Sequence, residues 1–362
     1  MERGATVEIS LGNLAFNLRK LKKKIGSRGF IAVVKADAYG HGATEVARKL
    51  DSLGVQHFGV AFLNEAIQLR EAGIKKEILV FFDQDISPEI INYRLTPVIN
   101  SLSYARALSR LAKRHSTRIG CHVNIDTGMG RMGLNGSNLD SQLDRILSLE
   151  GLYVKGIMSH FSDADLEDRG FALEQVERFK RIRNSIGKKL KDCFFHMANS
   201  AALLCLKDAY FDAVRPGLIL YGVNPYSKEE FRPVMTVKSP VLSIRRLKKG
   251  TPVSYGRTFI TIRDSRVGVI PLGYADGFFR RSSNRVEFLV KGIRVPVIGR
   301  VCMDLTLIDL TNVRGVKEGD WVTIVGRQDK EEITAIELAE KTQTIAYEVL
   351  TSLGRLNRRV FI

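Results

Sequence analysis

Cysteine is scarce in this chain of 362 residues. Its four cysteines have neither the spacing of a zinc site nor that of a redox pair; they are Cys121, Cys193, Cys205 and Cys302. Long apolar runs are absent, and none reaches the ~18 residues that a membrane helix needs. The opening "MERGATVEISLGNL" also lacks the pattern of an export signal. We therefore expect free thiols in a cytoplasmic protein, with no metal site and no membrane partner.

Acidic residues are outnumbered by basic ones, 39 to 56, which gives a net charge of +17. Such a charge can indicate nucleic-acid binding. The basic residues are spread along the chain, however, in the segments 19–24, 180–191 and 245–249 and at the C-terminus. No helix-turn-helix, zinc-finger or RNA-recognition pattern accompanies them. A nucleic-acid partner is not expected, and this alternative predicts a steeply salt-dependent affinity.

The first two thirds of the chain alternate short β-branched or aromatic segments with amphipathic stretches of helical period. Eight such segments are found, at 30–34, 57–61, 78–82, 96–99, 118–125, 152–158, 193–197 and 211–214. This alternation predicts parallel βαβ units. A doubly wound sheet would accept it too, but the count of eight favours a TIM (β/α)8 barrel within the α/β class.

From about residue 227 the pattern changes to short strands separated by glycine-bearing turns. These strands are expected at 234–247, 252–254, 259–262, 267–271, 286–290, 294–298, 305–309 and 321–325, with a helix pair over roughly 333–352. We therefore predict a barrel domain over 1–226 and a mostly β domain over 227–362. The first few residues are candidates for pairing with the β domain.

Polar side chains follow the predicted barrel strands, where a TIM barrel places its active site. They include Lys35, whose amine would become nucleophilic toward a carbonyl if it were desolvated. Residues near Ser200 and the Gly217–Leu218 amides are candidates for a phosphate site. A Schiff base with a sugar phosphate or with pyridoxal phosphate is consistent with this arrangement, and spacing leaves both open.

Eight ordered blocks of the sequence closely resemble the alanine racemases, the barrel-type (fold type III) pyridoxal-phosphate enzymes. The blocks are "AVVKADAYGHG" (32–42), "NIDTGMGRMG" (124–133), "MSHFSDAD" (158–165), "HMANSAA" (196–202), "VRPGLILYG" (214–222), "VSYGRTF" (253–259), "PLGYADGF" (271–278) and "GRVCMDLT" (299–306). The first block alone would also fit smaller pyridoxal-binding proteins that have no second domain.

The resemblance implies a role for each matching residue. Lys35 would hold pyridoxal 5'-phosphate and act as the base on the D-face of the substrate, and Tyr255 of the partner subunit would act on the L-face. The remaining cofactor contacts would come from Tyr39, His160, Asn199, Ser200, Arg215, Gly217 and Leu218. The substrate contacts would come from Arg131, Met303, Asp304 and Tyr274. In the family, His160 lies between Arg215 and Tyr255, and Tyr274 lines the entry route.

The implied function is the interconversion of L-alanine and D-alanine by a head-to-tail homodimer with shared sites, which would supply D-alanine for peptidoglycan. Two bases on opposite faces move the Cα proton without turning the substrate. A racemase of the same fold that acts on serine or basic amino acids is an alternative, because one methylene is worth only ~1–3 kcal/mol. A non-catalytic pyridoxal-phosphate binder is another, although it would need neither Tyr255 nor a β domain.

Two positions depart from the family pattern. Many relatives have a carbamylated lysine where this chain has Asn124, so the Asn124 amide or an anion such as chloride is expected to orient Arg131 instead. Relatives often read "RVPR" near the C-terminus, in some cases after a tyrosine that reaches the phosphate. This chain reads "GRLNRR", with Arg355 at that place. The phosphate site is therefore expected to differ on that side.

Overall fold

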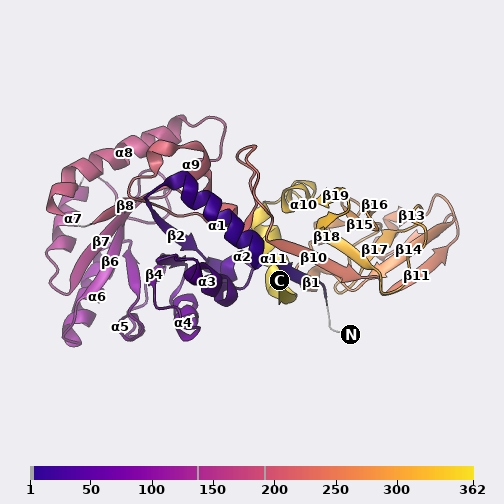
Figure 1. The fold of residues 1–362 in the computed structure, drawn as a ribbon, viewed down its shortest axis with the longest axis horizontal. Coiled ribbons are helices and arrows are strands. Elements are labelled where there is room, and N and C mark those ends of the chain that lie inside the picture. The colour runs from indigo at the N-terminus through magenta and orange to yellow at the C-terminus, as the bar shows by residue number, and fades with distance from the viewer. Residues whose placement is uncertain (1–3, 137, 191–192) are drawn as a thin grey trace.

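The structure is a computed structural model that describes residues 4–136, 138–190 and 193–362. It consists of a barrel and a β domain arranged along the long axis of the molecule, with the helix α11 (Ala346–Leu356) between them (Figure 1). Among the helices of the described residues, none is both long enough and apolar enough to span a bilayer.

The barrel is closed by eight parallel strands, as the sequence predicts. They are β2 (Gly29–Val33), β3 (His57–Val60), β4 (Glu77–Val80), β5 (Thr96–Ile99), β6 (Ile119–Asn124), β7 (Leu152–Met158), β8 (Phe194–His196) and β9 (Ala213–Val214). The ring closes where Gly29 and Phe30 pair with Ala213 and Val214. Most strand residues are buried on both faces, because the helices cover the outside.

The helices around the barrel present apolar faces to the strands. They are α1 (Leu11–Ile25), α3 (Ala43–Ser52), α4 (Leu63–Glu71), α5 (Glu89–Asn92), α6 (Leu102–Arg114), α7 (Leu139–Leu147), α8 (Gly170–Ile186) and α9 (Ser200–Cys205). Ser10 and Ser101 cap α1 and α6 by accepting the N–H groups of Asn13 and Tyr104, each at 3.2 Å. Such caps satisfy N–H groups that the helix cannot, and they fix where each helix begins.

The β domain contains three sheets. The largest runs β16 (Ile293–Pro296), β15 (Glu287–Val290), β18 (Trp321–Gln328), β10 (Met235–Pro240), β1 (Thr6–Ile9) and β20 (Arg358–Phe361), with β19 (Glu331–Ile333) beside β18. The second contains β11 (Ser243–Leu247), β14 (Ser265–Ile270) and β17 (Thr306–Asp309), and the third contains β12 (Pro252–Val253) and β13 (Phe259–Ile260). The segment 234–247 forms two strands, because the chain leaves the first sheet after Pro240 and joins the second at Ser243.

The N-terminal strand β1 belongs to the β domain's sheet and not to the barrel. It pairs antiparallel with β10 and parallel with β20, with Thr6 opposite both Lys238 and Arg358. The chain thus enters and leaves the molecule through neighbouring strands, and α1 carries it from this sheet to the barrel (Figure 1).

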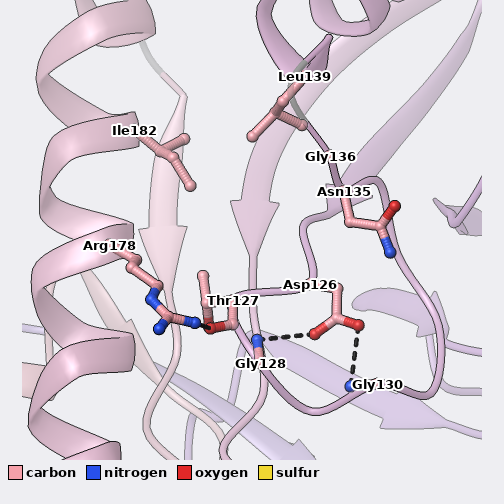
Figure 2. A pocket seen from close by; sticks show the side chains of 9 residues that line it. All are labelled: Asp126, Thr127, Gly128, Gly130, Asn135, Gly136, Leu139, Arg178 and Ile182. Atoms are coloured by element: carbon pink, nitrogen blue, oxygen red, sulfur yellow. Dashed lines mark hydrogen bonds between the residues drawn. The ribbon is translucent and has the colours of Figure 1, made fainter.

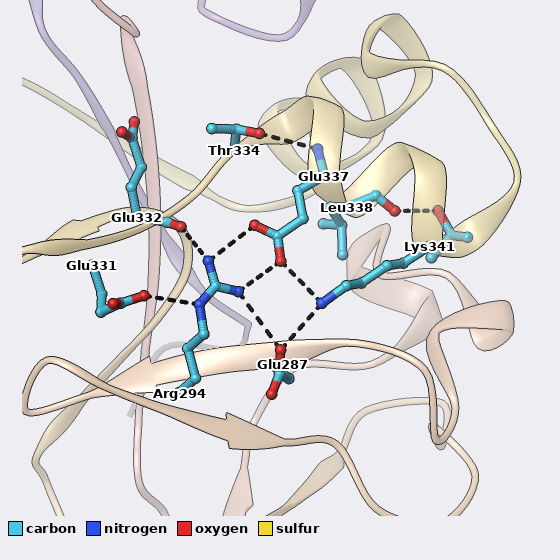
Figure 3. A network of polar contacts seen from close by, with 9 residues as sticks. Glu287, Arg294, Glu331, Glu332, Thr334, Glu337, Leu338 and Lys341 are labelled. Carbon is cyan, nitrogen blue, oxygen red and sulfur yellow. Dashed lines mark hydrogen bonds and ion pairs between the residues drawn. The ribbon is translucent and has the colours of Figure 1, made fainter.

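The helices α10 (Ala335–Thr342) and α11 form the expected pair near the C-terminus. An ion-pair network ties α10 to the edge of the large sheet (Figure 3). Arg294 of β16 contacts Glu337 at 2.7 Å and Glu331 at 2.9 Å, and Lys341 contacts Glu337 at 3.0 Å and Glu287 at 3.2 Å. A network of alternating charges holds a helix in place better than an isolated surface pair does.

Candidate active site

A cavity of about 480 Å³ lies at the carboxyl ends of the barrel strands, where a TIM barrel carries its chemistry. Its lining includes most of the barrel residues that the sequence singles out. These are Lys35, Tyr39, Asn124, Arg131, His160, Asn199, Ser200, Arg215 and Gly217. Residues that sequence reasoning does not identify also line it, namely Phe81, Phe82, Met129, Ile345 and Tyr347.

Lys35 begins a turn of unusual handedness. The next four residues, Ala36 to Tyr39, all have φ between 53° and 56°, so they form one left-handed turn before Gly40. Non-glycine residues pay roughly 1–2 kcal/mol each for this conformation. Four of them together cost on the order of 4–8 kcal/mol, which the surrounding contacts must offset.

Glu65 of α4 holds the start of this turn. One carboxylate oxygen accepts the Ala36 N–H at 2.6 Å, and the other accepts the N–H groups of Ala61 at 2.7 Å and Phe62 at 3.2 Å. A carboxylate only accepts hydrogen bonds, so it matches three converging donors better than an amide would. The Glu65 charge also raises the pKa of Lys35, against the larger opposing effect of burial.

The pKa of the Lys35 amine is lowered, first by burial and then by the positive charges of Arg131 and, more weakly, Arg215. Lys35 Nζ and Arg131 Cζ lie 5.3 Å and 5.2 Å from the centroid of the Phe82 ring. Both cations therefore lie against the same aromatic ring. A buried amine next to two guanidinium groups gives up its proton more easily than a free lysine does, as a nucleophile or base requires.

Arg215 lies buried at the inner wall of the cavity. It donates to the carbonyl oxygens of Ser159 at 2.6 Å, His196 at 2.8 Å and Met197 at 3.1 Å. Burial, and then the charge of Arg131, lowers the pKa of Arg215 to about 9, so it remains charged at neutral pH. It is therefore a fixed hydrogen-bond donor that faces the cavity, and these three acceptors are carbonyl oxygens rather than carboxylates.

A chain of imidazoles runs from Arg215 into the barrel core. Arg215 lies 2.8 Å from Nδ1 of His196, and Nε2 of His196 lies 2.8 Å from Nδ1 of His122. Because arginine only donates, the proton of His196 must be on Nε2 and that of His122 also on Nε2. Burial lowers the pKa of His122 to about 3, so it stays neutral. His160 lies 3.3 Å from Arg215 on the cavity side.

The opposite end of the cavity collects hydroxyl and amide groups. The Ser200 oxygen accepts the N–H groups of Gly217 at 3.0 Å and Ile219 at 3.3 Å. A Cβ atom at Gly217 would collide with the Tyr39 hydroxyl, so glycine keeps this space open. The N-cap of α9 is Asn199, which accepts the Ala202 N–H at 3.0 Å. Ser200 is therefore not the N-cap of α9, although its position at the start of this helix would allow that role.

Leu218 does not line the cavity with its side chain, which is buried. Leu218 is the first residue of the 3-10 helix η3 (Leu218–Tyr221), so its N–H has no partner within that helix. The amide of Leu218, rather than its side chain, is the group available beside Ser200.

Tyr347 supplies a tyrosine at this same end, from α11. Its ring lies 5.8 Å from the Tyr39 ring, and its hydroxyl lies 3.0 Å from that of Tyr226. Arg355, where the sequence places a departure from the family, is exposed and is not one of the cavity-lining residues. Although Arg355 departs from the family pattern, this part of the cavity still contains a tyrosine, which is Tyr347.

The loop after β6 presents Arg131 to the cavity. Asp126 holds this loop by accepting the N–H groups of Met129 at 2.7 Å, Gly128 at 2.8 Å and Gly130 at 2.9 Å. Figure 2 shows the outer side of the same loop, where Arg178 of α8 donates to the Thr127 carbonyl at 3.0 Å. Both carboxylate oxygens of Asp126 are thereby engaged with the backbone.

Asn124 uses both of its amide N–H groups within the barrel. They go to Asn100 Oδ1 at 2.8 Å and to the Met132 carbonyl at 2.9 Å. Its Oδ1 is buried and has no hydrogen-bond partner among the described residues. The Asn124 amide therefore makes no hydrogen bond to Arg131 among the described residues, and the expected direct orientation of Arg131 by this amide is not observed.

The residues that the sequence assigns to the active site from the β domain lie apart from this cavity. Tyr255, Tyr274 and Met303 have exposed fractions of 68%, 43% and 53%, and Asp304 is also exposed. The segments of Tyr274 and Met303 lie side by side, since the N–H of Tyr274 donates to the Cys302 carbonyl and that of Ala275 to the Met303 carbonyl. Tyr255 comes between β12 and β13, and Figure 1 shows β13 at the end of the molecule far from the barrel.

Fold and site together define a class of two-domain barrel proteins that carry a lysine of lowered pKa at the barrel mouth. Family models agree with this class: the alanine racemase N-terminal domain matches residues 9–225, and the alanine racemase C-terminal domain matches residues 234–361. The chain belongs to the alanine racemase family.

Individual relatives give the same result. The alanine racemase of Thermodesulfovibrio yellowstonii is 49% identical over 366 residues, which cover 100% of this chain and 99% of that protein. The crystal structure of Bacillus anthracis alanine racemase with bound L-Ala-P has a TM-score of 0.92 at 32% identity, covering 100% of this chain and 96% of that one. That of the Bartonella henselae enzyme with covalently bound pyridoxal phosphate has a TM-score of 0.90 at 30% identity, covering 100% of each chain.

Proposed function

We propose that this protein interconverts L-alanine and D-alanine with pyridoxal 5'-phosphate as cofactor. The observation that carries the proposal is the barrel cavity, where an amine of lowered pKa lies between a buried arginine and a cluster of hydroxyl and amide groups. The family membership supports the same reaction. A class I aldolase would share the lysine, but the attached β domain with its exposed Tyr255 has no use in that chemistry.

The residues present fit this cofactor. Lys35 offers the amine, and Tyr39, Tyr347, Ser200 and the Leu218 amide offer donors for a phosphate at the end of the cavity where Gly217, whose own N–H goes to Ser200, makes room for the Tyr39 hydroxyl. Arg215, with His160 beside it, would face the pyridine ring, and Asn199 would border it. When bound, pyridoxal phosphate supplies an electron sink that stabilises the negative charge left on Cα.

The chain's own residues move the proton. In this proposal Nζ of Lys35 exchanges the Cα proton on the D-face of alanine, and the hydroxyl of Tyr255 exchanges it on the L-face. The lowered pKa of Lys35 favours the neutral amine that such a base needs. Arg215 only donates hydrogen bonds, so the pyridine nitrogen beside it would stay unprotonated, which would limit charge delocalisation into the ring and thereby disfavour side reactions.

The substrate carboxylate would be held by Arg131, whose loop Asp126 fixes. Met303 and Asp304 would complete the carboxylate site, and Tyr274 would line the entry. Because these residues and Tyr255 are exposed on the β domain, we propose that they act on the cavity of a second copy of this chain. A head-to-tail homodimer would then contain two shared sites.

We further propose that the enzyme works in the cytoplasm and supplies D-alanine for peptidoglycan. The test is chiral chromatography of L-alanine after incubation with purified protein and pyridoxal phosphate, with L-serine and L-lysine in parallel. Equal D- and L-alanine, with the other amino acids unchanged, is expected. Comparable racemisation of serine or lysine would indicate the broader-specificity enzyme, and no racemisation with cofactor bound would refute the proposal.

Variants assign the two bases. Lys35→Ala and Tyr255→Phe should each lower racemisation by at least ~10²-fold, the usual contribution of a positioned acid or base. Tyr153→Phe is the matched control, because Tyr153 is also exposed, at 43%, but lies at the start of a barrel strand away from the cavity. It should leave the activity unchanged.

A further inference from the structure

The last strand of the chain touches the left-handed turn that follows Lys35. Arg359 of β20 forms an ion pair with Asp37, and its guanidinium also lies 3.4 Å from the Gly40 carbonyl. The two side chains are partly buried, at 27% and 23% exposure. Arg359 therefore reaches from the β domain's sheet across to the barrel's lysine turn.

Asp37 carries this contact further into the barrel. Its second oxygen accepts the N–H of Ala43 at 2.7 Å, at the start of α3. One carboxylate thus joins the turn, the following helix and the C-terminal strand. The imidazole of His41, which is buried, bonds the carbonyls of Ala38 at 2.9 Å and Tyr39 at 3.1 Å from within the same loop.

The helix α11 presses on the turn from the same side. A Cβ atom at Gly40 would lie 2.5 Å from the Leu350 carbonyl oxygen and 3.2 Å from Gly354 Cα. This close approach needs a glycine on the turn, and Gly40 has φ of 84°. Two elements near the C-terminus therefore meet a segment whose backbone is strained at four positions.

We propose that Arg359 is a positioning residue for the cofactor lysine. By binding Asp37 and Gly40 it holds residues 36–39 in the left-handed form, which presets the Lys35 amine and the Tyr39 hydroxyl toward the cavity. Since β20 pairs with β1, the seating of the β domain's sheet is coupled to the turn. The inference rests on the proposed function only in taking Lys35 as the residue that captures pyridoxal phosphate.

The test compares Arg359→Met with a matched control, Lys238→Met. Lys238 pairs with Glu8 at 2.8 Å with similar exposures of 29% and 28%, in the same sheet, but away from the turn. Hydrogen–deuterium exchange of the cofactor-free protein reports on residues 36–43 directly. We expect exchange of this segment to quicken at least about tenfold in Arg359→Met and to be unchanged in Lys238→Met.

A second readout is the dissociation constant of pyridoxal phosphate, measured by equilibrium dialysis. It should rise about tenfold or more in Arg359→Met, recover partly in Arg359→Lys, and show no further rise when Asp37→Asn is added to Arg359→Met. Asn is chosen because it keeps the bond to Ala43 and tolerates the left-handed region. Unchanged exchange and affinity in Arg359→Met would overturn the proposal.

The outcomes also separate this inference from the proposed function. If the unsubstituted protein does not bind pyridoxal phosphate, the function fails, whereas the exchange result still decides whether Arg359 holds the turn. Equal losses of thermal stability and affinity in Arg359→Met and Lys238→Met would assign Arg359 a merely structural role and overturn the positioning proposal.

Discussion

Complementation between two inactive variants tests whether Tyr255 acts on the cavity of a second chain. Lys35→Ala removes the barrel lysine, and Tyr255→Phe removes the β-domain hydroxyl. In the proposed dimer each site takes its lysine from one chain and its tyrosine from the other. A mixed dimer then has one site with both residues altered and one site with both intact.

The size of the effect follows from counting. If the chains pair at random in equal amounts, half of the dimers are mixed, and each mixed dimer has one working site of two. The mixture should therefore recover about a quarter of the unsubstituted activity, although each parent variant is nearly inactive. The exposed Tyr255 and the lysine within the barrel of the same chain are the reasons for expecting recovery.

The assay uses co-expressed chains with different affinity tags, so that the mixed dimer can be isolated and its racemisation measured alone. The isolated mixed dimer should reach about half of the unsubstituted rate. Activity no higher than that of the parent variants, in a mixed dimer that binds pyridoxal phosphate, would refute the shared site. It would mean that Tyr255 serves the lysine of its own chain or has no part in the reaction.

Three further outcomes are expected. Tyr347→Phe should raise the dissociation constant of pyridoxal phosphate up to about tenfold, for one lost hydrogen bond, while Arg355→Ala should leave it unchanged in equilibrium dialysis. Burial lowers the pKa of His41 to about 4, so the unfolded chain binds more protons as pH falls from 6.5. Urea unfolding of the cofactor-free protein should show a loss of stability between pH 6.5 and 4 to which His41 contributes up to ~3 kcal/mol, and His41→Gln should remove this component. His122→Leu should lower the unfolding free energy by about 1–3 kcal/mol by leaving Nε2–H of His196 without an acceptor.

Much of the fold was predictable, because local patterns decide it. Eight buried segments alternating with amphipathic helices predicted the barrel, and all eight strands form. The strands β19 and β20 were not predicted as strands. They are short, and β20 carries two arginines, so only their pairing partners make them strands. Pro240 ends β10 where an uninterrupted strand was expected, since proline lacks the N–H that continues a ladder.

In the candidate site, too, the residues that follow predicted strands could be identified, and those placed by tertiary packing could not. Lys35 and Arg215 could be identified because they follow predicted strands, and strand ends of a barrel converge. Phe82 also follows a strand, in "ILVFF", but reads as core in the sequence. Glu65 and Tyr347 could not be found this way, because their roles depend on how α4 and α11 pack on the lysine turn. The sequence alone also gives no sign of the pair formed by Asp37 with the distant Arg359.

Charge balance explains why this cavity suits an anionic cofactor and substrate. Lys35, Arg131 and Arg215 line it together, and burial first, then their mutual repulsion, lowers the pKa of both Lys35 and Arg215. Among the described lining residues the carboxylate is that of Asp126, and backbone N–H groups occupy both of its oxygens. The charges of Asp126 and of Glu65, which acts on Lys35, offset only part of the positive charge of these three side chains. A phosphate at one end and an amino-acid carboxylate beside Arg131 would balance it, so both ligands should stabilise the fold as they bind.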